Sequence, residues 1–188
     1  MKSVSGMIKE FEKIVTLKDG SKVLLRPLRK RDKEKLLEMF LTLSDESTKY
    51  LKHDVKNREL IENWINHLNY DHVLPIIGVL EKNGTERIIA DSTLHFYKSK
   101  QKRSVAWIRI SVHQDYQNKG LGTEMINFLI EIGERIGLKR LCLYCVVENL
   151  IAIRLFEKTG FTVDGTMKKS FQSRDGRMLD TYLMCRSI

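Results

Sequence analysis

The chain has few prolines and no apolar segment long enough to cross a bilayer. It contains two prolines and no low-complexity tract in 188 residues, which argues against a flexible linker between domains. We therefore expect one domain, residues 1–188, with ample length for a sizeable core. The first six residues also lack the apolar core of a signal peptide. The sequence predicts a cytoplasmic protein without a membrane partner.

Cysteine is scarce as well, with three residues, and two of them form a Cys-x-x-Cys pattern at Cys142 and Cys145. Residues 141–147 are expected to form a strand, where side chains three positions apart point to opposite faces. Redox pairs lie at a helix N-terminus, and a zinc site needs two further ligands nearby. We therefore expect both cysteines to be small apolar core residues in a reducing compartment, and we expect no metal site.

Basic residues outnumber acidic ones, which gives a formal net charge of +9. The basic residues are scattered along the chain, and no helix-turn-helix, zinc-finger or aromatic RNA-binding signature is present, so specific nucleic-acid binding is not expected. The densest basic cluster lies between two strand-like segments and comprises Lys98, Lys100, Lys102 and Arg103. We expect a solvated hairpin turn there, with contact to a ligand phosphate as the alternative.

Hydrophobic periodicity and turn residues predict a mixed α/β domain. A hairpin over 13–28 precedes two helices, the second capped by Asn57, and then come antiparallel strands over 73–81, 87–97 and 104–112. A long amphipathic helix ends at Gly137, and strand 140–147 must run parallel to strand 104–112 because a helix joins them. A shorter helix between Asn149 and Gly160 and two final strands over 161–171 and 177–186 complete the order.

The most informative motif is Gln117-Asn118-Lys119-Gly120-Leu121-Gly122-Thr123, between an apolar strand and the long helix. Two glycines allow close approach of the backbone, and amides at a helix N-terminus favour an anion such as a diphosphate. The motif lacks the Gly-Lys-Ser/Thr order of a Walker loop and the third glycine of a dinucleotide fingerprint. A strand-to-helix turn without a ligand is the alternative.

The pattern Gln-x-x-Gly-x-Gly resembles the acyl-CoA pyrophosphate loop of the GCN5-related N-acetyltransferase (GNAT) superfamily. The segment from Val147 to Phe161 is similar to the second signature of that family, and the order of elements matches over nearly the whole chain. Two C-terminal motifs, Gly160-Phe161-x-x-x-Gly165 and Asp175-Gly176-x-x-x-Asp180-x-x-x-Met184, resemble the branch of ribosomal-protein N-terminal and phosphinothricin-type acetyltransferases. The N-terminal segments 25–28 and 43–47 resemble the acetyltransferase module of protein lysine acetylases.

This resemblance implies a mixed, mostly antiparallel sheet with a splayed parallel strand pair and flanking helices. It implies an N-acetyltransferase that moves an acetyl group from acetyl-CoA, without a metal, to a primary amine by direct attack in a ternary complex. The acceptor is left open among a protein N-terminus, a lysine and a small amine, and a homodimer is also left open. The implied acetyl-CoA-binding residues are Ile110, Val112, Gln117, Asn118, Lys119, Gly120, Leu121, Gly122, Thr123, Asn149 and Phe156.

Two positions depart from the family pattern, and both concern catalysis. Trp107 stands where many members have a glutamate base, and Phe156 stands where many have a tyrosine that protonates the CoA thiolate. Tyr144 and Glu148 are the catalytic candidates that we select, and Asp91 and Tyr182 are further alternatives. An acyl-CoA-binding sensor or interaction module without turnover is the alternative function.

Overall fold

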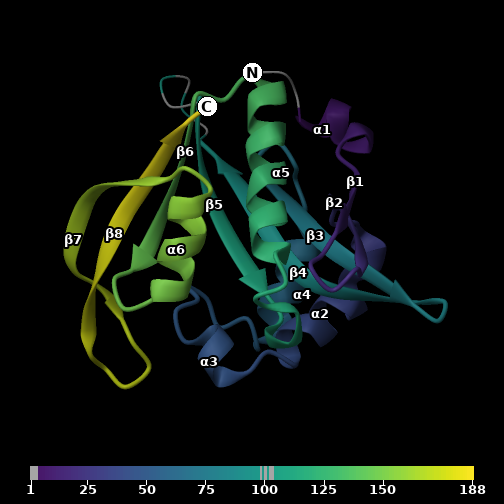
Figure 1. Ribbon diagram of the computed structural model, residues 1–188, viewed down its shortest axis with the longest axis horizontal. Coiled ribbons are helices and arrows are strands. Elements are labelled where there is room, and N and C mark those ends of the chain that lie inside the picture. The colour runs from purple at the N-terminus through teal and green to yellow at the C-terminus, as the bar shows by residue number, and fades with distance from the viewer. Residues whose placement is uncertain (1–3, 98, 100, 102–103) are drawn as a thin grey trace.

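The computed structural model describes residues 4–97, 99, 101 and 104–188. The basic cluster at Lys98, Lys100, Lys102 and Arg103 lies outside the described residues. Eight strands form one sheet in the order β1-β2-β3-β4-β5-β6-β8-β7 (Figure 1). The strands are β1 (Lys13–Thr16), β2 (Lys22–Pro27), β3 (Val73–Lys82), β4 (Thr85–Phe96), β5 (Val105–Val112), β6 (Arg140–Val146), β7 (Thr162–Gln172) and β8 (Met178–Ser187).

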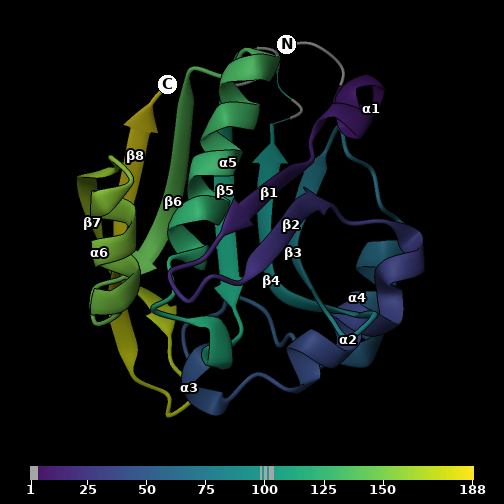
Figure 2. The same ribbon diagram turned by 45° about the vertical axis from the view of Figure 1, so that its right-hand side comes forward.

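Helices cover both faces of this sheet (Figure 2). The long helix α5 and the shorter α6 pack on one face, and α2 and α4 pack on the opposite face over β3 and β4. Each side has its own buried apolar cluster, so the sheet separates two cores. The helices are α1 (Val4–Met7), α2 (Lys33–Leu41), α3 (Asp45–Thr48), α4 (Arg58–Asn66), α5 (Leu121–Ile136) and α6 (Leu150–Lys158).

Local signals account for several element ends. Asn83 and Gly84 both have positive φ, +53° and +76°, and form the tight turn between β3 and β4. Asn57 caps α4, because its Oδ1 accepts a hydrogen bond from the Leu60 amide at 3.2 Å. The predicted mixed α/β fold is therefore confirmed. The short helices α1 and α3 and the insertion of β8 between β6 and β7 are additions to the predicted order.

The parallel strands β5 and β6 pair over only part of their length. They share three register pairs, which end at Trp107 opposite Cys142, although β5 continues to Val112 and β6 continues to Val146. The two strands diverge beyond that point (Figure 1). The expected splayed parallel pair is confirmed, and it leaves an opening in the middle of the sheet.

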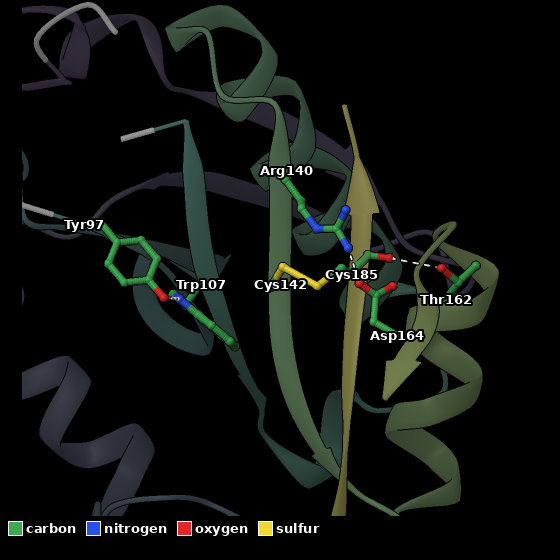
Figure 3. The surroundings of a disulfide bond; sticks show 7 residues. All are labelled: Tyr97, Trp107, Arg140, Cys142, Thr162, Asp164 and Cys185. Atoms are coloured by element: carbon green, nitrogen blue, oxygen red, sulfur yellow. Dashed lines mark hydrogen bonds and ion pairs between the residues drawn. A yellow bond between two sulfur atoms is a disulfide. The ribbon is translucent and has the colours of Figure 1, made fainter. Parts of the chain in front are cut away.

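The cysteines differ from the prediction. Cys142 on β6 lies directly opposite Cys185 on β8, with their Cα atoms 4.2 Å apart, and the two form a disulfide (Figure 3). The prediction that Cys142 is an unpaired core residue is therefore wrong, and the argument from cysteine usage for a reducing compartment is lost. Cys145 is a free, buried thiol whose pKa is raised by burial to about 11. Cys142 and Cys145 do not form a pair, as the strand argument predicted.

Two further findings concern membrane spans and metal sites, which the sequence was not expected to contain. Within the described ranges, no helix combines the length and apolar character needed to span a membrane. Among the same residues, no group of three or more histidine, cysteine or acidic side chains is placed to hold a metal ion.

Candidate active site

A cleft of about 1070 Å³ passes through the opening between β5 and β6. On one side of the sheet it is bordered by the N-terminal end of α5 and by α6, and on the other by residues of β4, β7, β8, α3 and the segment after α3. The cleft therefore joins the predicted phosphate-binding loop to the opposite face of the sheet. Ten of the predicted site residues line it: Ile110, Val112, Gln117, Asn118, Gly120, Gly122, Thr123, Tyr144, Asn149 and Phe156.

The loop before α5 presents unpaired amides at the cleft. Asn118 and Gly120 adopt positive φ, +60° and +93°, so the backbone turns sharply into the helix. The first helical bond runs from the Glu124 amide to the Gly120 carbonyl at 3.1 Å, so the amides of residues 121–123 have no acceptor within the helix. Together with the helix dipole, these amides suit a diphosphate.

Contacts on both sides hold this loop in place. The Lys18 amide donates to the Lys119 carbonyl at 3.0 Å, and the Lys119 ammonium pairs with Asp19 at 3.1 Å. Gln117 Nε2 donates to the Val112 carbonyl at 3.0 Å, which ties the loop to the end of β5. The side chains of Lys119 and Leu121 do not line the cleft, and Leu121 is buried in the core. These two residues support the loop from behind.

The second predicted signature lies beside the loop. A Cβ on Gly122 would lie 3.2 Å from Leu155 Cδ2, so the glycine permits close packing of α5 on α6. Asn149 caps α6 by accepting from the Ala152 amide at 3.2 Å, and its side-chain NH2 group is not used by this cap. Phe156 is 5% exposed and packs edge-to-face on Phe161, with ring centroids 5.8 Å apart.

An aromatic pair lies where the strands separate. Trp107 of β5 stacks on Tyr144 of β6, with ring centroids 4.6 Å apart and an interplanar angle of 23°. Trp107 Nε1 donates to the Tyr97 hydroxyl at 2.5 Å (Figure 3). Tyr144 is 53% exposed and lines the cleft, so its hydroxyl is accessible to a bound molecule.

The other catalytic candidates lie outside the lining of the cleft. The Glu148 carboxylate accepts from Arg177 at 3.3 Å on the protein surface. Tyr182 packs against the core under α5 and α6. Asp91 is half-buried on β4, where burial raises its pKa from 3.8 to about 7. Tyr144 is therefore the one candidate of these four that the described structure brings to the cleft.

Sequence reasoning missed a cluster on the far side of the sheet, formed by the basic residues Lys52 and Arg109 together with His95. His95 lies opposite Trp107 in the β4–β5 register, and Arg109 lies opposite Thr93, so all four side chains share one face. Burial, followed by the charge of Arg109, lowers the pKa of His95 to about 4. Strand alternation could have placed His95 and Arg109 together, but Lys52 comes from a loop whose position no sequence pattern indicates.

Comparisons with known proteins agree with this geometry. The model of the acetyltransferase (GNAT) domain family matches residues 22–162. An acetyltransferase of the GNAT family from Streptococcus pneumoniae has a similar structure, with a TM-score of 0.75 and 23% identity over 88% of this chain and 99% of that one. At this identity the likeness concerns the fold.

Curated relatives are similar over part of their length. L-amino acid N-acetyltransferase AaaT of Escherichia coli is 28% identical over 53% of this chain and 61% of its own. Spermine/spermidine N(1)-acetyltransferase of Bacillus subtilis is 34% identical over 38% and 48%. [Ribosomal protein bS18]-alanine N-acetyltransferase of Escherichia coli is 35% identical over 42% and 53%. The matches thus span about half to three fifths of these relatives.

Proposed function

Because the chain belongs to the acetyltransferase (GNAT) family, we propose that it transfers an acetyl group from acetyl-CoA to a primary amine. The observation that carries this proposal is the cleft that joins the loop before α5 to the opposite face of the sheet. A donor bound at the loop and an acceptor bound on the far face would meet within the opening between β5 and β6. Such an arrangement favours direct transfer in a ternary complex.

The residues present fit the donor. The unpaired amides of residues 121–123 are suited to the diphosphate, and the backbone of β5 beyond Trp107 has no partner from β6 in the sheet register. An extended pantetheine arm with its two amides would pair with that backbone near Ile110 and Val112 in the manner of an added strand. The side chains of Asn149 and Phe156 border the same part of the cleft.

The reaction requires little covalent chemistry from the protein. The nitrogen lone pair of a neutral amine attacks the thioester carbonyl carbon, a C–N bond forms, and the C–S bond breaks. One amine proton is lost to solvent or to a base, and the departing thiolate gains a proton to give CoA. Positioning the two reactants supplies much of the rate, and a proton donor adds to it. We propose Tyr144 as that donor because its accessible hydroxyl lies in the cleft. The second catalytic candidate is Glu148, whose carboxylate is paired with Arg177 and would act as a base.

Acetyl transfer is tested by mixing the protein with acetyl-CoA and a panel of amines, namely free amino acids, their amides, polyamines and peptides. Release of CoA thiol is followed together with the mass of the amine product. We expect amine-dependent release with a mass increase of one acetyl group. Acetyl-CoA binding without turnover of any amine would instead support a sensor or interaction module. This alternative is retained because Trp107 and Phe156 replace the glutamate and tyrosine that the family resemblance implies.

A further inference from the structure

The charges that line the cleft are mostly positive. Glu46 is the only acidic residue among its described lining residues, and the carboxylate of Glu46 is paired with Lys49 at 3.7 Å. Five basic residues line the same cleft: Lys18, Lys52, Arg109, Arg154 and Lys158. Lys18 borders the phosphate-binding loop, and Arg154 and Lys158 belong to α6, so these three suit the phosphates of CoA. Binding of the donor gives no reason for the positive charges of Lys52 and Arg109.

Arg109 points away from the donor side of the sheet. Its neighbours Ile108 and Ile110 pack into the core beneath α5, and side chains alternate along a strand. The Arg109 guanidinium therefore faces the side opposite the phosphate-binding loop. A single guanidinium on this face is badly placed to neutralise the diphosphate, which indicates a different anion.

The charge of Arg109 is uncompensated within the described part of the chain. No carboxylate there forms an ion pair with Arg109 or with Lys52. Arg109 is accessible from the cleft, yet the atoms around it desolvate it enough to lower its pKa. After burial, Arg109 is the largest cause of the lowered pKa values of His53 and His95. Asp91 shares this face of β4, but burial raises its pKa to about 7 and it forms no ion pair with Arg109. The far face thus has a positive potential that no ion pair among the described residues offsets.

The C-terminal hairpin and the segment around α3 meet at this end of the cleft. Arg174, from the turn between β7 and β8, donates to Thr48 Oγ1 of α3 at 2.8 Å. Tyr50 packs edge-to-face on Phe171 of β7, with ring centroids 6.5 Å apart. These contacts join the C-terminal hairpin to the segment after α3 and border the far end of the cleft.

We infer that the acceptor is a small primary amine that carries a carboxylate close to the amine, as an α-amino acid does, and that Arg109 binds this carboxylate with support from Lys52. The inference rests on the proposed acetyl transfer. A guanidinium fork matches the two oxygens of a carboxylate. The same charges repel the extra ammonium groups of a polyamine and favour loss of a proton from the attacking amine.

The test compares each free L-amino acid with its primary amide, and both with spermidine. Binding to the protein saturated with CoA is measured by calorimetry, and turnover with acetyl-CoA is measured by thiol release. Three variants accompany the wild type: Arg109→Gln, Arg109→Lys and Arg31→Gln. Arg31 is exposed on the segment before α2 and lies outside the cleft lining, so its variant removes one charge without touching the site.

We expect at least one amino acid to bind about tenfold or more tightly than its amide, since loss of a charge-assisted hydrogen bond has an effect of this order. Arg109→Gln should abolish that preference, Arg109→Lys should restore it in part, and Arg31→Gln should keep it. Equal or tighter binding of the amides or of spermidine would overturn the inference, as would an unchanged preference in Arg109→Gln. Because binding to the CoA complex is measured separately, absence of turnover would count against acetyl transfer without deciding the acceptor class.

Discussion

The indole of Trp107 stacks on the phenol ring of Tyr144 across the point where β5 and β6 separate. The indole is fixed in turn by its hydrogen bond to the Tyr97 hydroxyl. The stack therefore orients Tyr144 beside the opening, and it gives the tryptophan a role at a position where the family resemblance implies a glutamate. Trp107 cannot act as a base, but it positions Tyr144, whose hydroxyl can donate a proton.

Tyr144→Phe should lower kcat by about tenfold to a hundredfold while acetyl-CoA affinity stays the same, because only the proposed proton donor is removed. The aromatic stack with Trp107 survives this change. Steady-state kinetics with the best amine, together with calorimetry of acetyl-CoA, measure both effects. Glu148→Gln is the comparison, with a smaller expected loss because the Glu148 carboxylate pairs with Arg177. A larger loss in Glu148→Gln would reverse the assignment.

Gly120→Val should weaken acetyl-CoA binding by more than about tenfold, because a β-branched residue strains a backbone with φ of +93° and displaces the amides that follow. Gly176→Val is the matched control, since Gly176 has φ of +84° in a hairpin turn away from the loop. It should lose comparable stability and keep its affinity. Equal affinities for the two variants would contradict the role of the loop.

Phe156→Tyr should keep or raise turnover, because the added hydroxyl would lie at the cleft, where the departing thiolate needs a proton. The ring packs on Phe161, so a modest loss of thermal stability is expected if the hydroxyl finds no partner. Turnover at saturating substrates and the melting temperature are the measurements. A folded variant that binds acetyl-CoA normally but has lost turnover would show that Phe156 is required as it is.

The disulfide predicts one reactive thiol in the denatured, unreduced protein and three after reduction, counted by alkylation and mass spectrometry. Cys185→Ala should destabilise the fold by about 2–4 kcal/mol, as expected for opening a link between residues 43 positions apart. Replacing both Cys142 and Cys145 by Ala also opens the disulfide, so this variant should lose at least as much stability as Cys185→Ala, with lost packing at Cys145 in addition. Its turnover at a temperature where it stays folded should remain within about a few-fold, because neither sulfur takes part in acetyl transfer. Three reactive thiols before reduction would exclude the bond.

Asp91→Asn should stabilise the protein at neutral and mildly alkaline pH and have little effect near pH 4. In the folded protein the carboxyl keeps its proton up to about pH 7, whereas the unfolded chain loses it near 3.8. Between these values the unfolded state binds fewer protons, so Asp91 makes stability fall as pH rises. The midpoint of urea unfolding, followed from about pH 4 to pH 8, measures the difference. A parallel pH dependence for wild type and variant would contradict the raised pKa.

Short-range patterns predicted most of the elements. The Asn83-Gly84 turn, the Asn57 cap and the glycine end of α5 each depend on residues within a few positions, so the sequence shows them directly. The loop that we propose for the donor could be located for the same reason, because residues 117–123 are contiguous. The group on the far face that we propose for the acceptor could not, since His95 and Arg109 are brought together by the β4–β5 register and Lys52 comes from a loop after α3. The Cys142–Cys185 bond likewise depends on β8 lying beside β6.

The early end of the β5–β6 ladder has a consequence for selectivity. An open sheet has unpaired backbone edges only at its two outer strands. Here β5 and β6 each have a further short unpaired edge inside the sheet, beyond their last register pair. The N–H and C=O groups of such an edge can form hydrogen bonds with any extended chain that carries amides, whatever its substituents. If the loop before α5 binds the diphosphate as proposed, discrimination for the donor comes from its phosphates. A pantetheine fragment without phosphates should then compete poorly, although its amides can still pair with these edges.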